Sequence, residues 1–432
     1  MNRKLSGAER TVWLVDRADT VNAGAVVRIA AQIEEKALRV ALNWLQKRHT
    51  MLRTRVDIVG GRAPVHPDDE SIPPISLRVE DRQGNDHWQL EAQQELSRGL
   101  PSTRQPLVSV VLLKSQDVSE IILTLHHVYN DTATVLYLMR DLLGLLAQLM
   151  KGSHIPSLQV YPERRALDHL PSGGVRLMSS LMRTTALMVT HVTNVVQQGP
   201  QKPARRSLPQ RTLPRPAALR RGDGLYQRGA PRLLHYALTR EETALLAECC
   251  KSENASLHGA AVAAAFQAAI KYTGASATAP GLTGLYASSL YRPPAAARMA
   301  EVGLFVPLVM PGVLSRTQGQ FWDVARLARA TAFDAVRQEL PLVAIPLPQR
   351  LLNLVRQPHA GAILMTGLSH EGVLHVTVQG MGTLDSFGVV TNRFGQRLVL
   401  SFLYPRWVRS VARADLLGAA VVKNLRAAMG AE

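Results

Sequence analysis

Apolar residues form two recurring patterns along the chain, and each pattern indicates a different kind of secondary structure. Short runs rich in Val, Ile and Leu predict strands in the N-terminal part at GAVVRIAAQI, LRTRVDIV, ISLRV, LVSVVLL and EIILTLHH. Helical spacing predicts two helices, one in EEKALRVALNWLQKRHTML and one after Asp131. Their buried faces would be formed by Leu38, Ala41, Leu42 and Leu45, and by Val135, Leu138, Met139, Leu142, Leu146 and Leu149. This mixture predicts an α/β lobe over residues 1–155.

A similar mixture begins again at PRLLHYALTREETALLAECCK. The pattern there predicts a strand, a helix that begins at Thr239 and a very Ala-rich helix at LHGAAVAAAFQAAIKYTG. A further helix around QFWDVARLARATAFDAVRQEL and a C-terminal helix accompany strands expected at GLTGLYASSLY, VGLFVPLVM, GAILMTGL, VLHVTVQG and RLVLSFLY. We therefore expect a second α/β lobe of similar size over residues 233–432.

Residues 156–232 differ from both lobes in composition. Prolines recur throughout this stretch, which excludes long regular elements and predicts a crossover linker. Only residues 175–197 have a helical pattern, and Arg176, Arg183 and His191 interrupt its apolar residues. We expect an amphipathic packing helix there, with a lid or a peripheral membrane contact as the alternative.

The same linker carries much of the positive charge. The formal net charge of the chain is +17, and residues 202–232 contain nine Lys or Arg residues against one acid, Asp223. Such a surplus favours acidic partners or polyanions, although a merely solvated linker would have the same composition. Aromatic residues make up 5% of the chain and no nucleic-acid-binding motif is present, so we expect no specific nucleic-acid partner.

The remaining bulk features indicate an ordinary intracellular protein. Cys249 and Cys250 are adjacent, which is typical of reduced thiols and not of a disulfide framework. The N-terminus lacks the apolar core of a signal peptide, and no uncharged apolar run reaches the ~20 residues that span a bilayer. We expect a cytoplasmic location and no transmembrane segment.

Candidate chemistry is concentrated in the stretch LTLHHVYNDTATV. His126 and His127 occupy consecutive positions at the end of a predicted strand, so their side chains should point to opposite faces. Asp131 lies at the strand-to-helix turn, where it would cap the helix or hold a cation. The alternative is a buried core histidine beside a simple helix cap. No third ligand follows at metal-binding spacing, so we expect no metal site.

The sequence lacks the motifs of several other chemistries. It contains no G-x-S-x-G elbow, no phosphate-binding G-x-x-x-x-G-K-[ST] and no dinucleotide-binding G-x-G-x-x-G. What remains is a histidine base without an attached nucleophile. Such a base suits the deprotonation of an alcohol or amine that attacks an activated acyl group.

The same stretch also carries a family resemblance. HHVYNDT resembles the HHxxxDG signature of the condensation-domain superfamily of acyl-thioester-dependent acyltransferases, which is related to chloramphenicol acetyltransferase. ASLHGAAVAAAFQAAI and GLYASSLYRP followed by VGLFVPLVMP are similar to later segments of that superfamily, and an earlier segment has its RHxxLRT pattern at Arg48, His49, Leu52, Arg53 and Thr54. In length and in its FWDVARLARA helix the chain is similar to polyketide-associated O-acyltransferases and to wax-ester or alcohol acyltransferases.

The resemblance implies a fold and roles for single residues. It implies two chloramphenicol-acetyltransferase-like lobes that form a pseudo-dimer, with a tunnel at their junction. His127 would be the general base or would position the nucleophile, and His126 would be structural. Asp131 would pair with a buried arginine, for which Arg292 is the best candidate. Thr132 departs from the motif, because the family has glycine at that position.

The resemblance also implies substrates. The donor would be an acyl thioester on coenzyme A or on the phosphopantetheine arm of an acidic carrier protein, and the acceptor a small alcohol or amine. No acyl-enzyme and no permanently bound cofactor are expected. Because Thr132 and the altered stretch TGLSHEGVL, with His370, depart from the family pattern, a catalytically silent module that docks a carrier protein is the alternative.

Overall fold

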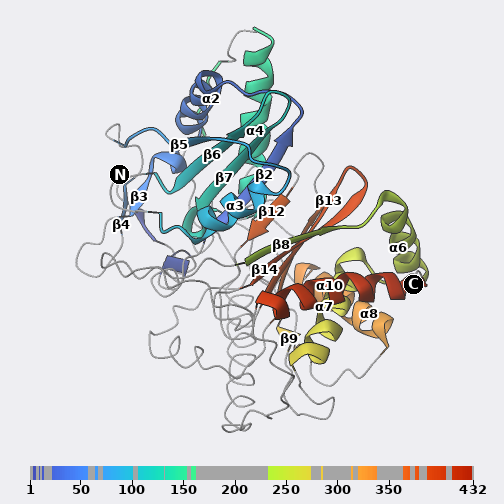
Figure 1. Cartoon of the computed structure of the whole chain (residues 1–432). Coiled ribbons are helices and arrows are strands. Elements are labelled where there is room, and N and C mark those ends of the chain that lie inside the picture. Colours follow the sequence, from blue (N-terminus) through green and yellow to red (C-terminus); the bar gives the residue numbers. More distant parts are fainter. Residues whose placement is uncertain are drawn as a thin grey trace, which may run out of the picture.

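Two large sheets with helices packed on them dominate the described part of the chain in this computed structural model, and two smaller sheets, β1-β4-β3 (Arg3–Lys4, Pro64–His66, Arg55–Val56) and β10-β9 (Val313–Leu314, Gly284–Leu285), accompany them (Figure 1). The structure describes residues 3–5, 9, 12–13, 22–56, 64–66, 72–100, 106–130, 132–152, 157–161, 232–273, 284–285, 313–314, 320–337, 363–369, 375–378, 387–404 and 411–430. The expected mixed α/β architecture is confirmed. The predicted helix within residues 175–197 and the predicted strand VGLFVPLVM lie outside the described residues.

The first sheet has five strands in the order β12-β2-β7-β6-β5. Four of them come from the N-terminal part: β2 (Asn22–Ile29), β5 (Ser76–Asp81), β6 (Val108–Lys114) and β7 (Ser119–His126). The central strand β7 pairs antiparallel with β2 and β6, whereas β5 and β6 are parallel. Every residue of β7 is buried, as the apolar run predicts for a strand that is covered on both faces.

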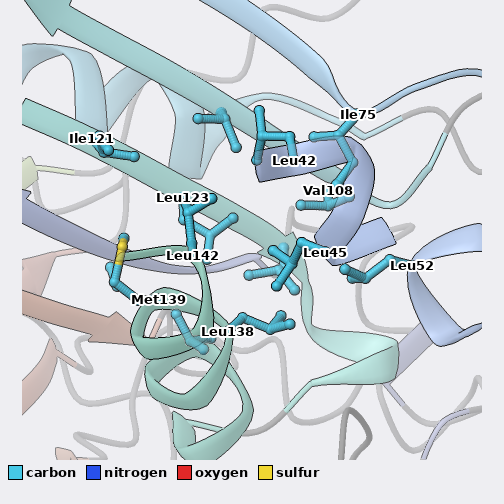
Figure 2. Packing of buried hydrophobic residues seen from close by; sticks show 14 of the residues in the cluster. Leu42, Leu45, Leu52, Ile75, Val108, Ile121, Leu123, Leu138, Met139 and Leu142 are labelled. Carbon is cyan, nitrogen blue, oxygen red and sulfur yellow. The ribbon is translucent and has the colours of Figure 1, made fainter. Parts of the chain in front are cut away.

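One face of this sheet is covered by α2 (Glu35–Arg48) and α4 (Thr132–Met150). Figure 2 shows Leu42 and Leu45 of α2 packed with Leu138, Met139 and Leu142 of α4. The predicted apolar faces of both helices are thus confirmed as core. The predicted strand LRTRVDIV is wrong at its start, however, because its first two residues belong to the 3-10 helix η1 (Thr50–Arg53), and strand β3 (Arg55–Val56) follows among its described residues.

The opposite face is covered by α3 (His87–Ser97), which the apolar pattern does not predict. Its buried stripe includes two acids among the apolar residues: Trp88, Glu91, Ala92, Glu95 and Leu96. Arg78 on β5 pairs with Glu91 and lies 3.4 Å from Glu95, and Ser109 donates to Glu95 at 2.8 Å. These partners offset the cost of burying the two carboxylates.

The second sheet has the order β11-β13-β14-β8, with β8 (Arg232–Ala237), β11 (Ile363–Ser369), β13 (Phe387–Phe394) and β14 (Arg397–Tyr404). Its core joins β14 to the helices α6 (Arg240–Ser252), α7 (Leu257–Thr273), α8 (Phe321–Arg337) and α10 (Val411–Ala428). The predicted start of α6 is confirmed, because the Thr239 side chain accepts from the Glu242 backbone and the Glu242 side chain from the Thr239 backbone. Strand β13 was not among the predicted strands.

Among the described residues, the halves of the chain meet at strand β12 and at helix α3. Strand β12 (His375–Val378), far along the sequence, pairs antiparallel with β2 and so completes the first sheet (Figure 1). On the α3 side, Leu233 of β8 joins the apolar cluster under α3, and its backbone N–H donates to Gln93 Oε1 at 2.9 Å. The limits expected for the lobes at 155 and 233 stay a prediction.

Within the part of the chain that the structure describes, none of the helices has both the length and the apolar character needed to cross a membrane.

Close packing of α7 on α8 leads to the first prediction. A Cβ atom at Gly259 would overlap the carbonyl oxygen of Ala325, whereas one at Gly144, within α4, would meet nothing within 4 Å. Gly259→Ala should lower the free energy of unfolding by about 1–3 kcal/mol through overpacking. Gly144→Ala, the matched control, should raise it by roughly 0.5–1 kcal/mol because alanine is the better helix former. Urea denaturation measures both, and a Gly259→Ala variant as stable as the wild type would contradict this packing.

A pH dependence follows from His235, whose ring meets Trp88 edge-on across the contact between α3 and β8. Burial, together with the charges of Arg28 and Arg397, lowers the pKa of His235 from 6.5 to about 4. Between these values the unfolded chain binds a proton that the folded chain excludes. Stability is therefore complete above pH 6.5 and falls as the pH drops toward 4.

The wild type should lose about 2–3 kcal/mol more than His235→Gln between pH 7.5 and pH 4. Denaturant titrations of both proteins at several pH values measure this difference. Parallel stability curves for the two proteins would show that His235 does not titrate in this way.

Candidate active site

Strand β7 ends at His126, and His127 begins the 3-10 turn η2 (His127–Tyr129). The expectation that both histidines lie on the strand is therefore wrong for His127. The turn starts here because the backbone N–H of Val128 donates to Nδ1 of His126 at 3.1 Å, which caps the turn. Because His127 is not part of the strand, the alternation of side chains between the two faces of a strand does not determine the direction of its side chain.

His126 is a buried residue at the end of the sheet. Its side chain is 2% exposed, lies opposite Asn22 in the β2–β7 register and packs 5.9 Å from the Trp13 ring. Because Nδ1 of His126 accepts a hydrogen bond, the neutral ring carries its proton on Nε2. This arrangement suits an anchor of the turn.

His127 is half-buried and has the opposite tautomer. Its Nδ1 lies 2.7 Å from the carbonyl oxygen of Asn130. A carbonyl oxygen only accepts, so Nδ1 must carry the proton and Nε2 of the neutral ring has the lone pair. Of the two adjacent histidines, His127 is the one whose Nε2 is suited to take a proton.

Asn130 completes the turn and was not predicted from the sequence. It is fully buried, and its side-chain Nδ2 donates to the carbonyl oxygen of His126. The sequence does contain a signal for this role, an asparagine three positions after His127. Asn side chains often form hydrogen bonds with the backbone of their own turn. The buried side chains of Val128 and Tyr129 hold the turn against the core.

Comparison with known proteins places this turn in a family. The model of the family described as "Condensation domain" matches residues 13–164, which include β2, β7 and the histidine turn. The phosphinothricin tripeptide synthetase PhsC of Streptomyces viridochromogenes is 30% identical over 181 residues, which cover 38% of this chain and 17% of the synthetase. The malpinin synthetase of Mortierella alpina is 27% identical over 189 residues, which cover 40% of this chain and 2% of that synthetase. The chain thus spans less than a fifth of the length of these relatives.

Solved structures share the fold over nearly the whole chain. Polyketide synthase associated protein 5 from Mycobacterium tuberculosis matches with a TM-score of 0.66 and 14% identity, covering 99% of this chain and 98% of that one. The first condensation domain of the calcium-dependent antibiotic synthetase, in complex with a substrate analogue, has a TM-score of 0.67 and 15% identity, covering 100% and 97%. Likeness at such low identity shows the fold alone.

The comparisons support the condensation-domain superfamily: residues 13–164 match its family model, and the structural neighbours share its fold. Its fold is the mixed α/β, chloramphenicol-acetyltransferase-like fold of these structural neighbours.

Within the segment that matches the condensation-domain model, the RHxxLRT stretch joins α2 to α4. Asp141 of α4 lies 3.2 Å from Nε of Arg48 and 3.4 Å from Nε2 of the buried His49. Burial lowers the pKa of His49, which keeps its ring neutral at neutral pH. Burial alone would raise the pKa of Asp141, but the adjacent His49 ring and the hydrogen bonds from Arg140 bring it below its usual value.

The rest of this stretch satisfies backbone carbonyls. Arg53 donates to the carbonyl oxygens of Gln46 and Lys47 at the end of α2, and the Thr54 hydroxyl donates to that of Met51. Leu52 is buried in the core under α2. These contacts fix the end of α2 against α4, the helix that follows the histidine turn, so the RHxxLRT stretch is structural here.

Several predicted site residues are not described. Asp131, Arg292 and His370 lie outside the described residues, so the Asp131–Arg292 pair stays a prediction. Thr132 is the first residue of α4, and its side chain is likewise not described. Whether Thr132 narrows the site relative to glycine therefore also stays a prediction.

The two cysteines of the chain lie on α6, in its second half. Cys249 and Cys250 are free thiols near the end of α6, and burial raises the pKa of Cys250 to about 12, so it is a poor nucleophile. Among the described residues, no three His, Cys, Asp or Glu side chains come together as metal ligands do.

Proposed function

We propose that this chain transfers an acyl group from a thioester to the hydroxyl or amine of a small acceptor, with His127 as general base. The observation that carries the proposal is the 2.7 Å contact between Nδ1 of His127 and the Asn130 carbonyl, which puts the lone pair of the neutral ring on Nε2. The match of residues 13–164 to the condensation-domain model supports it, because condensation domains join acyl or peptidyl groups to acceptors through amide or ester bonds.

The reaction would proceed by direct attack. As Nε2 of His127 takes the proton of the acceptor O–H or N–H, the acceptor oxygen or nitrogen forms a bond to the thioester carbonyl carbon. The tetrahedral intermediate then collapses, the carbon–sulfur bond breaks, and the imidazolium returns its proton to the departing thiolate. An ester or amide and a free thiol result, and no acyl-enzyme forms.

The donor would be acyl-coenzyme A or an acyl group on a carrier protein. Carrier proteins are acidic and coenzyme A carries phosphates, so the net charge of +17 would attract either donor to the protein. The starter condensation domain of rhizomide synthetase, a structural neighbour with a TM-score of 0.63 and 13% identity, was solved in complex with C8-CoA. That complex supports a coenzyme A thioester as the first donor to try.

The test is thiol release from acyl thioesters of increasing chain length, on coenzyme A and on a carrier protein, with pooled alcohols and amines. We expect release that depends on the acceptor and that falls about 10²- to 10⁴-fold in His127→Ala, the range typical of a lost general base. His87→Gln is the matched control, because this histidine starts α3 and its Nδ1 accepts from the Gln83 backbone. It should keep wild-type activity.

Release that persists in a folded His127→Ala variant would contradict the role of His127. No release from any donor, combined with binding of the carrier protein, would favour the alternative of a silent docking module.

A further inference from the structure

Asn130 contributes two hydrogen bonds to the histidine turn, one from its side chain and one through its backbone. Nδ2 donates to the carbonyl oxygen of His126, four residues back, and the Asn130 carbonyl oxygen accepts from Nδ1 of His127. Asn130 is 0% exposed, so water does not replace either bond. The carbonyl oxygen of Asn130 thus sets the tautomer of His127, and the side chain of Asn130 helps to hold that carbonyl in place.

We propose that Asn130 is a positioning residue for His127, which holds the imidazole in the tautomer with Nδ1 protonated and Nε2 basic. The kinetic part of this proposal rests on the proposed function, whereas the part about the tautomer does not.

The specific contribution of Asn130 is its side-chain amide. Every residue at position 130 would provide a carbonyl oxygen, but few side chains reach back to His126 with an N–H donor. Without that donor the carbonyl of His126 is buried with no partner from position 130, and the turn has one bond fewer to hold its shape. The carbonyl of residue 130 would then no longer be held 2.7 Å from Nδ1 of His127.

The rest of the turn limits how it can relax. The backbone N–H of Val128 is bonded to Nδ1 of His126, and Val128 is 0% exposed. This bond orients the first histidine, whereas the carbonyl of Asn130 contacts Nδ1 of the second. Loss of the amide should therefore affect the ring of His127 more than that of His126.

Asn22 offers a matched control on the neighbouring strand. It is also 0% exposed, lies opposite His126 in the β2–β7 register, and uses its Nδ2 to donate to backbone carbonyls, here those of Glu95, Leu96 and Arg98. Asn22 and Asn130 thus make the same kind of buried bond, but the bonds of Asn22 hold the end of α3 and not the turn.

The experiment compares Asn130→Ala, Asn130→Ser and Asn22→Ala in the full chain. Nitrogen-15 NMR of histidine-labelled protein reports the tautomer of each ring, with His127→Ala to assign the signal. In the wild type we expect an unprotonated Nε2 for His127 and an unprotonated Nδ1 for His126. Asn130→Ala should move His127 toward a mixture of tautomers, Asn130→Ser should do so less because its hydroxyl still donates, and Asn22→Ala should leave His127 unchanged.

Steady-state transfer kinetics provide the second readout. In Asn130→Ala, kcat should fall about tenfold while KM changes little, a part of the 10²- to 10⁴-fold that general-base catalysis typically supplies. Asn130→Ser should retain more activity. If Asn130→Ala does not fold, Asn130→Ser is compared with the wild type and with Asn22→Ala instead.

A wild-type tautomer of His127 in a folded Asn130 variant would overturn the proposal, whatever the activity. An equal change of the tautomer in Asn22→Ala would overturn it as well, because the effect would then be general loss of stability. If the wild type transfers no acyl group, the proposed function fails, and the NMR comparison still decides the role of Asn130.

Discussion

The pairing of β2 with β7 is the constraint on which the rest of the first lobe depends. Its register runs from Asn22 opposite His126 to Ile29 opposite Ser119, and it assigns alternate residues to the two faces of the sheet. Odd-numbered residues of β7 face α2 and α4, and Ile122 faces α3. A slip of one residue would reverse both faces, so two different helix layers enforce one register. That register determines where β7 ends and hence where the histidine turn begins.

The sequence predicted those elements whose signals are local and conventional. The apolar stripe of α2 and the capping Thr239 of α6 each need only a few neighbouring residues, and both were found. Helix α3 was not, because Glu91 and Glu95 occupy stripe positions that a pattern of apolar residues counts as polar. Those acids are buried only because Arg78 and Ser109, on other elements, pair with them. The pairing of β12 with β2, two segments far apart in the chain, has no local signal at all.

At the candidate site, too, the features with a local sequence signal could be predicted and the others could not. A strand that ends at the first histidine could be predicted, and so could the helix after Asp131, but the prediction placed His127 on the strand and not in the 3-10 turn. The opposite tautomers of His126 and His127 could not, because they depend on the 3-10 turn and on one backbone carbonyl, which a strand pattern does not contain. The pair expected between Asp131 and Arg292 joins distant parts of the sequence, where motif resemblance is the only guide.

The chemistry of His127 and its placement therefore have different origins. Its tautomer is set by hydrogen bonds among residues 126–130, all of them local in sequence. Its position relative to the second half of the chain depends on distant contacts, β12 on β2 and Leu233 under α3. A short motif can thus remain recognisable while whole-chain identity to structural neighbours is as low as 13%. Under the proposed function, a substitution in the turn should change the basicity of His127, and one at α3 or β12 should change which substrate atoms lie near His127.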